Sequence, residues 1–208
     1  QQDRALLQLI ASRVAAAVEN ARLYRRIERQ NRTQRTLAAM AQEFSSILDL
    51  DQLLEKVALS IKRLINYDAF MVMVVDQAAG VLRTVHSRRF DETQPRASLP
   101  LGQGITGAAA QTGKPVLAPD TSADPRYVDW HPGIRSELAV PLIVKDRVIG
   151  VLDVESRRLN YFDEDHVRLL SLIAPSIAIA IENARLYEEL AQREREIQQD
   201  LQAAHNLQ

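Results

Sequence analysis

The chain has 208 residues, a hydrophobic fraction of 46% and a formal net charge of −1, which together are typical of a globular protein. Because it contains no cysteine, the sequence excludes disulfides, zinc–thiolate sites, iron–sulfur clusters and thiol catalysis. Nucleic-acid binding normally needs a clustered basic surface, which this balance of charges does not favour.

No apolar run in the sequence reaches the length of a membrane-spanning helix, and the first residues lack the pattern of a signal peptide. We therefore expect a cytoplasmic protein that does not bind a membrane.

The N-terminal stretch from residue 2 to about residue 47 is predicted to be one helix or two nearly continuous helices. It contains no glycine or proline, and apolar residues recur every three or four positions. Its middle part, residues 30–36, has no apolar residue. We interpret this part as a solvated linker or as the weak part of a coiled coil.

This first helix repeats a sequence found near the end of the chain. The run from Glu19 to Tyr24 is identical to the run from Glu182 to Tyr187, at a spacing of 163 residues. A second likeness, at the same spacing, joins the segments that begin at Leu6 and Leu169. We infer that the chain begins inside the last helix of a preceding copy of the same domain.

The next segment alternates between helix and strand signals. Asp49 and the glutamine three residues later form a plausible capping pair for a helix that ends near residue 65. Residues 69–75 and 81–88 are predicted to be strands joined by a turn at residues 77–80. Residues 89–100 are polar on the whole and are predicted to be a loop.

The central stretch, residues 101–156, begins with a small-residue helix. This helix is predicted over residues 104–112, because Gly113 and then Pro115 give the usual signals of a helix end. The connection from residue 115 to residue 135 contains several prolines and the only tryptophan, Trp130. Loops of this length inside a compact domain are usually functional or disordered.

A β-hairpin is predicted at the end of this stretch. Its strands would be residues 137–144 and 148–155, joined by the polar residues 145–147. Alternate positions on both faces of the second strand are largely apolar. We therefore expect the sheet to be covered on both sides.

The last helix is predicted to begin at Asp163 or its neighbours and to continue to the end of the chain, with a kink at Pro175. Beyond Tyr187 its apolar residues keep a heptad-like spacing that a single domain cannot bury. We therefore expect pairing with another helix, most simply in a homodimer through the terminal helices.

The order of motifs G-I-T-G, T-G-K-P-V, D-x-x-x-D-P-R-Y, R-S-E-L-A-V-P-L, V-I-G-V-L and N-Y-F-D-E resembles the GAF family of sensory domains. The resemblance implies an α+β fold, a GAF/PAS-like antiparallel sheet of five or six strands with helices on both faces and long terminal helices. It divides the chain into residues 1–35, the end of a preceding GAF repeat, residues 36–187, the GAF domain, and residues 188–208, a coiled-coil-like signalling helix.

The resemblance also implies a small-molecule pocket between one face of the sheet and a lid made by the short helix and the long loop. Aromatic side chains would give apolar contact there, and a few polar groups would orient a ligand. The candidate residues are Ile105, Ala108, Ala109, Asp120, Thr121, Tyr127, Trp130, His131, Ser136, Glu137 and Leu138. The alternative is that these residues pack the lid onto the sheet without any ligand.

No catalytic or metal site is predicted, and no cofactor is assigned. The four histidines lack metal-ligand spacing, and the glycines of G-Q-G-I-T-G lack the lysine and hydroxyl of a P-loop. GAF-like reductases of free methionine sulfoxide depend on cysteines, which are absent. In the N-K-F-D motif of cyclic-nucleotide-binding members, Tyr161 replaces the lysine here, so the lysine–aspartate pair cannot form.

We therefore predict a regulatory GAF sensor module of a bacterial-type signalling protein, and not an enzyme. It would bind a small ligand or a partner and transmit a change through its terminal helices to an effector outside residues 1–208. The last thirteen residues resemble the linker ahead of PPM-type phosphatases, although a histidine kinase or a diguanylate cyclase would fit equally well. The alternative is a ligand-free domain that serves for dimerisation or as a spacer.

Overall fold

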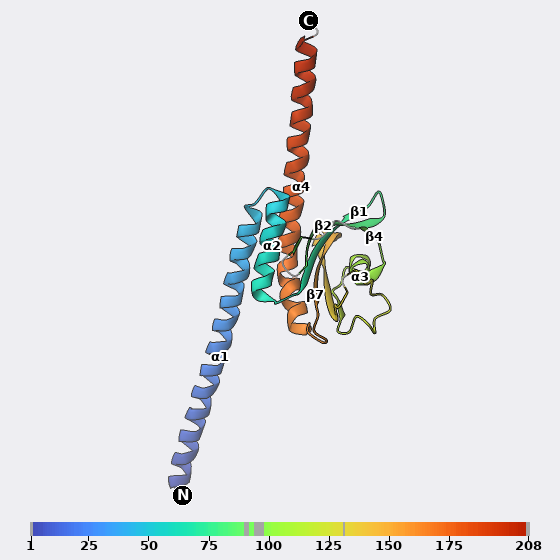
Figure 1. The fold of residues 1–208 in the computed structure, drawn as a ribbon. Helices are drawn as coiled ribbons and strands as arrows, with labels where there is room; N and C mark the ends of the chain where they lie inside the picture. The colour runs from blue at the N-terminus through green and yellow to red at the C-terminus, as the bar shows by residue number, and fades with distance from the viewer. Residues whose placement is uncertain (1, 90–91, 94–97, 131, 207–208) are drawn as a thin grey trace. The chain divides into compact units, whose positions relative to one another are not determined.

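The computed structural model describes residues 2–89, 92–93, 98–130 and 132–206, and Figure 1 shows their fold. Contacts divide the chain into two compact units, one up to Met40 and the other from Ala41 onward. The two units are described separately. All candidate site residues belong to the second unit.

Helix α1 runs without a break from Gln2 to Ser45. This confirms the predicted N-terminal helix and shows that residues 30–36 are helical despite their lack of apolar side chains. Within the first unit Val18, Leu23 and Ile27 are exposed, each by about half of its surface. These three apolar side chains, among those described on α1, therefore lack a cover within their own unit.

The second unit contains a seven-stranded antiparallel sheet with helices on both faces, which confirms the predicted α+β, GAF-like fold. The order of the strands is β3-β2-β1-β7-β6-β5, and β4 also pairs with β2. The strands are β1 (Ala69–Asp76), β2 (Val81–Arg89), β3 (Glu92–Thr93), β4 (Ser98–Pro100), β5 (Val116–Ala118), β6 (Ser136–Val144) and β7 (Arg147–Ser156).

Three of these strands lie in segments that the sequence predicts to be loops. They are β3, β4 and β5, which have only two or three residues each. Strands this short cannot show the alternation of apolar and polar residues that marks a strand in a sequence. The prediction of a loop over residues 89–100 is therefore wrong for the described residues of β3 and β4, which pair with β2.

Helices α2 (Leu50–Leu64) and α4 (Glu164–Asn206) pack on one face of the sheet, and α3 (Gly104–Thr112) packs on the other (Figure 1). We call these the helix face and the lid face. The α2 helix begins as predicted, since the Asp49 side chain accepts a hydrogen bond from the Gln52 backbone N–H at 2.8 Å. Gly113 ends α3 in the left-handed conformation, with φ of 62°.

Strand alternation sorts the buried side chains between the two faces. Phe70, Leu138 and Val154 are register partners on adjacent strands and belong to the helix face. Met73, Ala139 and Val151 contact α3 in the core of the lid face. Both groups are buried, which confirms that the sheet is covered on both sides.

Two central strands approach each other closely at Gly150. A Cβ atom there would lie 2.3 Å from the carbonyl oxygen of Met73 on β1. Only glycine therefore fits at this position without moving one of the two strands.

The predicted β6–β7 hairpin is confirmed, with a connection of two residues instead of three. Lys145 and Asp146 have φ angles of 48° and 64°, so both adopt the left-handed conformation. This is the geometry of the tight hairpin turns that favour asparagine and glycine. Both residues here carry a Cβ, so the turn stores some backbone strain.

The long α4 helix begins where the sequence predicts, because Asp163 Oδ1 accepts hydrogen bonds from the backbone N–H groups of Asp165 and His166, both at 3.0 Å. It continues through Pro175. By length and composition alone, Glu164–Gln199 would be long and apolar enough to cross a membrane, which the sequence analysis did not anticipate. Its apolar face includes Ile173, Ile177 and Ile181, which are fully buried in the domain core.

Candidate functional site

The candidate residues predicted on α3 and in the long loop differ in burial. Ile105 and Ala109 are buried against the lid face of the sheet, whereas Ala108 is half-buried and lies outside this core cluster. Tyr127 and Trp130 are half-buried and pack against the same cluster. His131 lies outside the described residues.

We call residues 119–135 the lid loop, and its base is closed by hydrogen bonds from Thr121. The Thr121 backbone N–H donates to the Arg135 carbonyl at 3.0 Å, and its hydroxyl donates to the Ile134 carbonyl at 2.9 Å. The Asp120 carboxylate accepts from the backbone and the hydroxyl of Ser122, and the hydroxyl bond lowers the pKa of Asp120. Both predicted residues thus organise the loop itself.

The three candidates on β6 do not share one face of the sheet. Glu137 projects on the lid face, next in the alternation to Ala139. Ser136 and Leu138 project on the helix face, and the Ser136 hydroxyl donates to the Arg158 carbonyl at 2.8 Å. Only Glu137 of the three can therefore belong to a site under the lid loop.

Glu137 belongs to an acidic cluster that also includes Asp153 and Glu155 of β7. Glu137 is the register partner of Glu155, and Asp153 is the partner of Ala139 one step along the same face. The relative exposures of Glu137, Asp153 and Glu155 are 5%, 0% and 3%. Three carboxyl groups are thus buried together on the lid face.

This burial changes the acidity of the cluster. Removal from water raises the pKa of Glu137 well above its ordinary value, and the nearby charge of Glu155 raises it further. Burial and then the charge of Glu137 raise the pKa of Asp153 in the same way. The cluster therefore holds protons that exposed carboxyl groups would release.

The buried hydroxyl of Tyr127 makes no hydrogen bond with the part of the chain that the structure describes. Both oxygens of the Asp153 carboxyl group are also buried and have no partner at ordinary hydrogen-bond geometry among the described residues. The Glu137 carboxyl and the Val154 backbone N–H nevertheless lie close enough to act on the pKa of Asp153 as hydrogen-bond partners. Burial, followed by the charge of Glu155, raises the pKa of Tyr127.

One cationic side chain of the lid loop lies near this cluster, and it is already paired. Arg126 donates two hydrogen bonds to Asp124, from Nε at 2.9 Å and from a terminal nitrogen at 2.6 Å. This pairing lowers the pKa of Asp124 and raises that of Arg126. The charge of Arg126 reaches Glu137 only over a distance, without a hydrogen bond between them among the described contacts.

The described residues contain no group of three or more histidine, cysteine or acidic side chains placed to hold one metal ion. The acidic cluster is therefore spread over two strands and does not converge on one point. Tyr161 replaces the lysine of the cyclic-nucleotide motif, and its ring packs under the Arg158 guanidinium. The central carbon of that guanidinium lies 3.7 Å from the centre of the ring. Tyr161 thereby helps to hold the connection between β7 and α4 in place.

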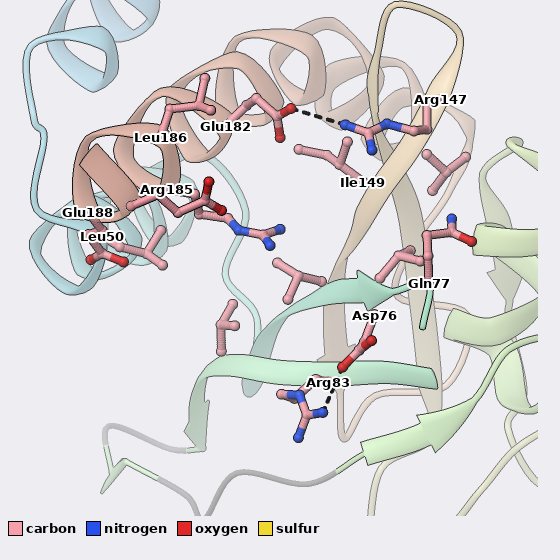
Figure 2. A pocket seen from close by; sticks show the side chains of 15 residues that line it. Leu50, Asp76, Gln77, Arg83, Arg147, Ile149, Glu182, Arg185, Leu186 and Glu188 are labelled. Atoms are coloured by element: carbon pink, nitrogen blue, oxygen red, sulfur yellow. Dashed lines mark hydrogen bonds and ion pairs between the residues drawn. The ribbon is translucent and has the colours of Figure 1, made fainter. Parts of the chain in front are cut away.

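A cleft of about 580 Å³ opens on the helix face, where α4 leaves the sheet (Figure 2). Charged side chains form its walls, and two ion pairs cross them, Arg147 to Glu182 at 3.0 Å and Arg83 to Asp76 at 2.8 Å. Leu186 also lines an adjacent groove of about 670 Å³, between the β6–β7 hairpin and α4. The sequence analysis did not predict either hollow.

An exposed apolar stripe runs along α4 beside these hollows and beyond them. About half or more of the surface of each side chain in the stripe is exposed. The side chains recur at intervals of seven or four residues. The stripe consists of Leu172, Ile179, Leu186, Leu190 and Ile197.

Sequence reasoning missed Asp153 and Glu155, which the structure buries beside the candidate residue Glu137. A signal was available in the sequence, because this strand contains two acids that are two positions apart. Both faces of the strand are otherwise apolar. A buried strand rarely contains charged residues unless they have a partner or a function. Glu137 was found only because the motif of the resemblance contains it.

Comparisons with known proteins agree with this fold. A family model described as the GAF domain matches residues 47–182. The chain is 38% identical over 72 residues to GAF domain-containing protein A of Dictyostelium discoideum, a match that covers 35% of the chain and 46% of that protein. It is 24% identical over 210 residues to the formate hydrogenlyase transcriptional activator of Salmonella typhimurium, which covers 96% of the chain and 30% of that protein. The chain thus spans half or less of the length of these relatives.

Among solved structures, the chain is similar to a free methionine-R-sulfoxide reductase from Neisseria meningitidis in complex with its substrate. The TM-score is 0.67 at 25% identity, and the match covers 74% of this chain and 91% of that one. The GAF domain of a phosphoenolpyruvate-protein phosphotransferase from Coxiella burnetii gives a TM-score of 0.65 at 19% identity, covering 76% and 96% of the two chains. The second likeness shows the fold alone.

Proposed function

The chain belongs to the GAF domain family, and we propose from this premise that it is a sensor module that binds a small ligand between the lid loop and the sheet. Its relatives include a transcriptional activator, which supports a regulatory role. Ligand binding would change how the lid loop and α3 pack on the sheet, and α4 would pass that change to an effector domain. A PPM-type phosphatase is one such effector.

The observation that carries this proposal is the double role of α4. One part of the helix packs Ile177, Ile181 and Ala184 into the core of the sheet. The same helix continues to Asn206 and carries the exposed stripe that includes Leu190 and Ile197. A shift of the sheet is therefore transmitted along one continuous element.

We propose that a second copy of the chain covers this stripe, giving a homodimer through α4. Heptad spacing of exposed apolar residues is the pattern by which two identical helices pack in parallel. The groove beside Ile179 and Leu186 adds an apolar surface that continues the stripe on the domain itself. An apolar surface of this length on one helix is unfavourable in water without a partner.

A second candidate function is a spacer that dimerises without a ligand. The packing of Tyr127, Val128 and Trp130 against the core of the lid face favours it, because these side chains already occupy the space under the lid loop. A sensor would have to open this packing when a ligand enters.

The composition of the chain argues against the enzyme function of the similar methionine sulfoxide reductases. The chain has no cysteine, so it cannot supply the thiol on which that chemistry depends.

Native mass spectrometry of the purified 208-residue chain, before and after denaturation, tests both functions. A sensor is expected to give a dimer with a non-covalent adduct that denaturation removes. A dimer without an adduct, which also remains without one after incubation with cell extract, would support the spacer. A monomer at concentrations of about 100 μM would overturn the proposed dimer.

A further inference from the structure

We propose that residues 6–24 of α1 are the closing helix of a second sheet of the GAF type, and that they dock on it through the face that carries Ala17, Val18 and Ala21. The proposal goes beyond the sensor function and does not depend on a ligand. It assigns a partner of stated structure to a surface that the described residues of the chain leave open.

The first argument is the match between this face and the face that α4 buries against its own sheet. Eight of the described residues of α4 are buried in the domain core. At the spacing of 163 residues, α1 has an apolar residue for each of them, identical in six cases and valine for isoleucine in two. A change from isoleucine to valine removes one methyl group and costs little in a core. The pairs are Leu170 and Leu7, Ile173 and Ile10, Ala174 and Ala11, Ile177 and Val14, Ala178 and Ala15, Ala180 and Ala17, Ile181 and Val18, and Ala184 and Ala21.

The second argument is the place of the differences between the two helices. Residues 6–24 and 169–187 differ by four exchanges of unlike residues, besides the two of valine for isoleucine. None of the four falls at a buried position of α4. A chance likeness between two amphipathic helices would not follow the burial of one of them. The four positions on α4 are Ser171, Pro175, Ser176 and Ile179.

The third argument is the contrast in exposure between the two faces. Ile181 is fully buried on α4, whereas its counterpart Val18 keeps 46% of its surface exposed. Ala17 and Ala21, on the same face of α1, are exposed as well. Because burial of apolar surface is favourable, this face gains from a partner that receives it as the sheet receives α4.

The partner is a sheet and not a single helix. The matched apolar positions spread over the wide stripe by which a helix covers a globular core, whereas a coiled coil needs only a narrow seam. The sheet of the second unit cannot be this partner, since α2 and α4 already pack on its helix face. The α4 helix follows its sheet in the chain, so the same order makes α1 the last helix of a sheet that precedes it. Helix α1 continues to Ser45, so one unbroken helix would carry a change of packing away from that sheet.

The lack of cysteine makes this face testable with a single introduced thiol. The test compares the 208-residue chain with a joined chain, in which residues 41–168 stand directly before residues 6–208. This junction keeps the spacing of the repeat, so α1 takes the place of α4 behind the added sheet. The added segment begins where the second compact unit begins, and it supplies every element of that unit up to the closing helix.

The thiol of Val18→Cys reports on the proposed contact. In the joined chain it should react with a thiol reagent at least about a hundredfold more slowly than in the 208-residue chain, because it is buried as Ile181 is. Asn20→Cys is the matched control, since the equivalent Asn183 is exposed on α4. Its thiol should react at the same rate in both chains.

A second comparison covers the case in which the added sheet does not fold. A joined chain with residues 169–187 in place of residues 6–24 gives the added sheet the sequence of its own closing helix. Both joined chains should show two folded units in urea unfolding. Val18→Asp should unfold the added unit of the first joined chain, because it buries a charge, and should leave the 208-residue chain as stable as before.

Three results would overturn the proposal. They are equal thiol reactivity of Val18→Cys in both chains, an added sheet that folds with residues 169–187 but not with residues 6–24, and protection of the thiol already in the 208-residue chain. The last result would mean that a second copy of the chain covers this face. None of the three concerns a ligand, so the sensor function would still be decided by native mass spectrometry.

Discussion

Glu137 and Glu155 are register partners at the end of the sheet where β6 begins and β7 ends, so that two buried acidic side chains lie side by side on one face. Like charges at such a cross-strand pair destabilise a sheet. The domain therefore keeps an unfavourable arrangement at the position that the lid loop covers. Residues that are costly for stability and retained in a buried site are candidates for function.

The pH dependence of stability should report on this cluster. The pKa of Asp153 is raised in the folded chain, above all by burial, so between about pH 4 and that raised pKa the unfolded chain has released a proton that the folded chain holds. The free energy of unfolding therefore falls as the pH rises, by up to about 1.4 kcal/mol per pH unit for each such group. Asp153→Asn should flatten this fall, as measured by urea unfolding between pH 5 and pH 8.

Asp163→Asn is the matched control for that experiment. The Asp163 carboxylate accepts hydrogen bonds from the start of α4, and these lower its pKa. The bond from the His166 backbone N–H has the largest effect. This carboxylate stabilises the fold above its unfolded pKa, and the benefit is lost as the pH falls. Its removal should therefore act mainly at higher pH and lower the stability. If Asp153→Asn behaved in the same way as this control, the buried cluster would not hold protons.

The hairpin turn offers a test of backbone strain. Asp146 has a φ of 64°, which glycine adopts freely and alanine does not. We expect Asp146→Gly to raise the free energy of unfolding by about 0.5–1 kcal/mol and Asp146→Ala to lower it by about 1 kcal/mol. Thermal unfolding of the two variants side by side measures the difference. Equal stabilities would show that the turn is not strained in the left-handed conformation.

The close approach of β1 and β7 predicts a severe effect at Gly150. The added Cβ of Gly150→Ala would lie 2.3 Å from the Met73 carbonyl oxygen, so the strands must separate. We expect a loss of about 3 kcal/mol or more in the free energy of unfolding, measured with urea. Gly80→Ala is the control, since its Cβ would meet nothing within 4 Å and only its φ of 68° costs energy. That variant should lose about 1 kcal/mol.

The proposed dimer depends on the exposed stripe of α4. Leu186→Glu places a charge at the point where the stripe meets both hollows, and it should convert the dimer to a monomer in sedimentation experiments. Leu59→Glu changes an exposed leucine on α2, away from the stripe, and should leave the dimer intact. Dissociation by both variants would mean that the interface is not formed by α4 alone.

The main features of the fold could be predicted because they depend on long, regular patterns. The α2 and α4 helices have stripes and acidic caps, and the β6–β7 hairpin has two apolar runs around a polar turn. The short strands β3, β4 and β5 could not be predicted. Their pairing is set by the neighbouring strand β2 or β6, and two or three residues contain no pattern of their own.

The arrangement of the candidate site residues was predictable only in part. Ile105, Ala109, Tyr127 and Trp130 meet over the sheet because the motif fixes their elements. The separation of Leu138 from Glu137 follows from strand alternation, and the sequence analysis did not apply this rule when it grouped them. The buried cluster with Asp153 depends on the register between β6 and β7, which only the three-dimensional pairing shows.

The two hydrogen bonds of Thr121 turn the lid loop into a ring that is closed where it meets the sheet. An insertion or deletion within such a ring changes its size without moving the ends, so β5 and β6 keep their register. A change of length in this loop would therefore leave the acids of β6 and β7 in place. Thr121 thus separates the part of the loop whose length is free to change from the strands whose register the sheet fixes.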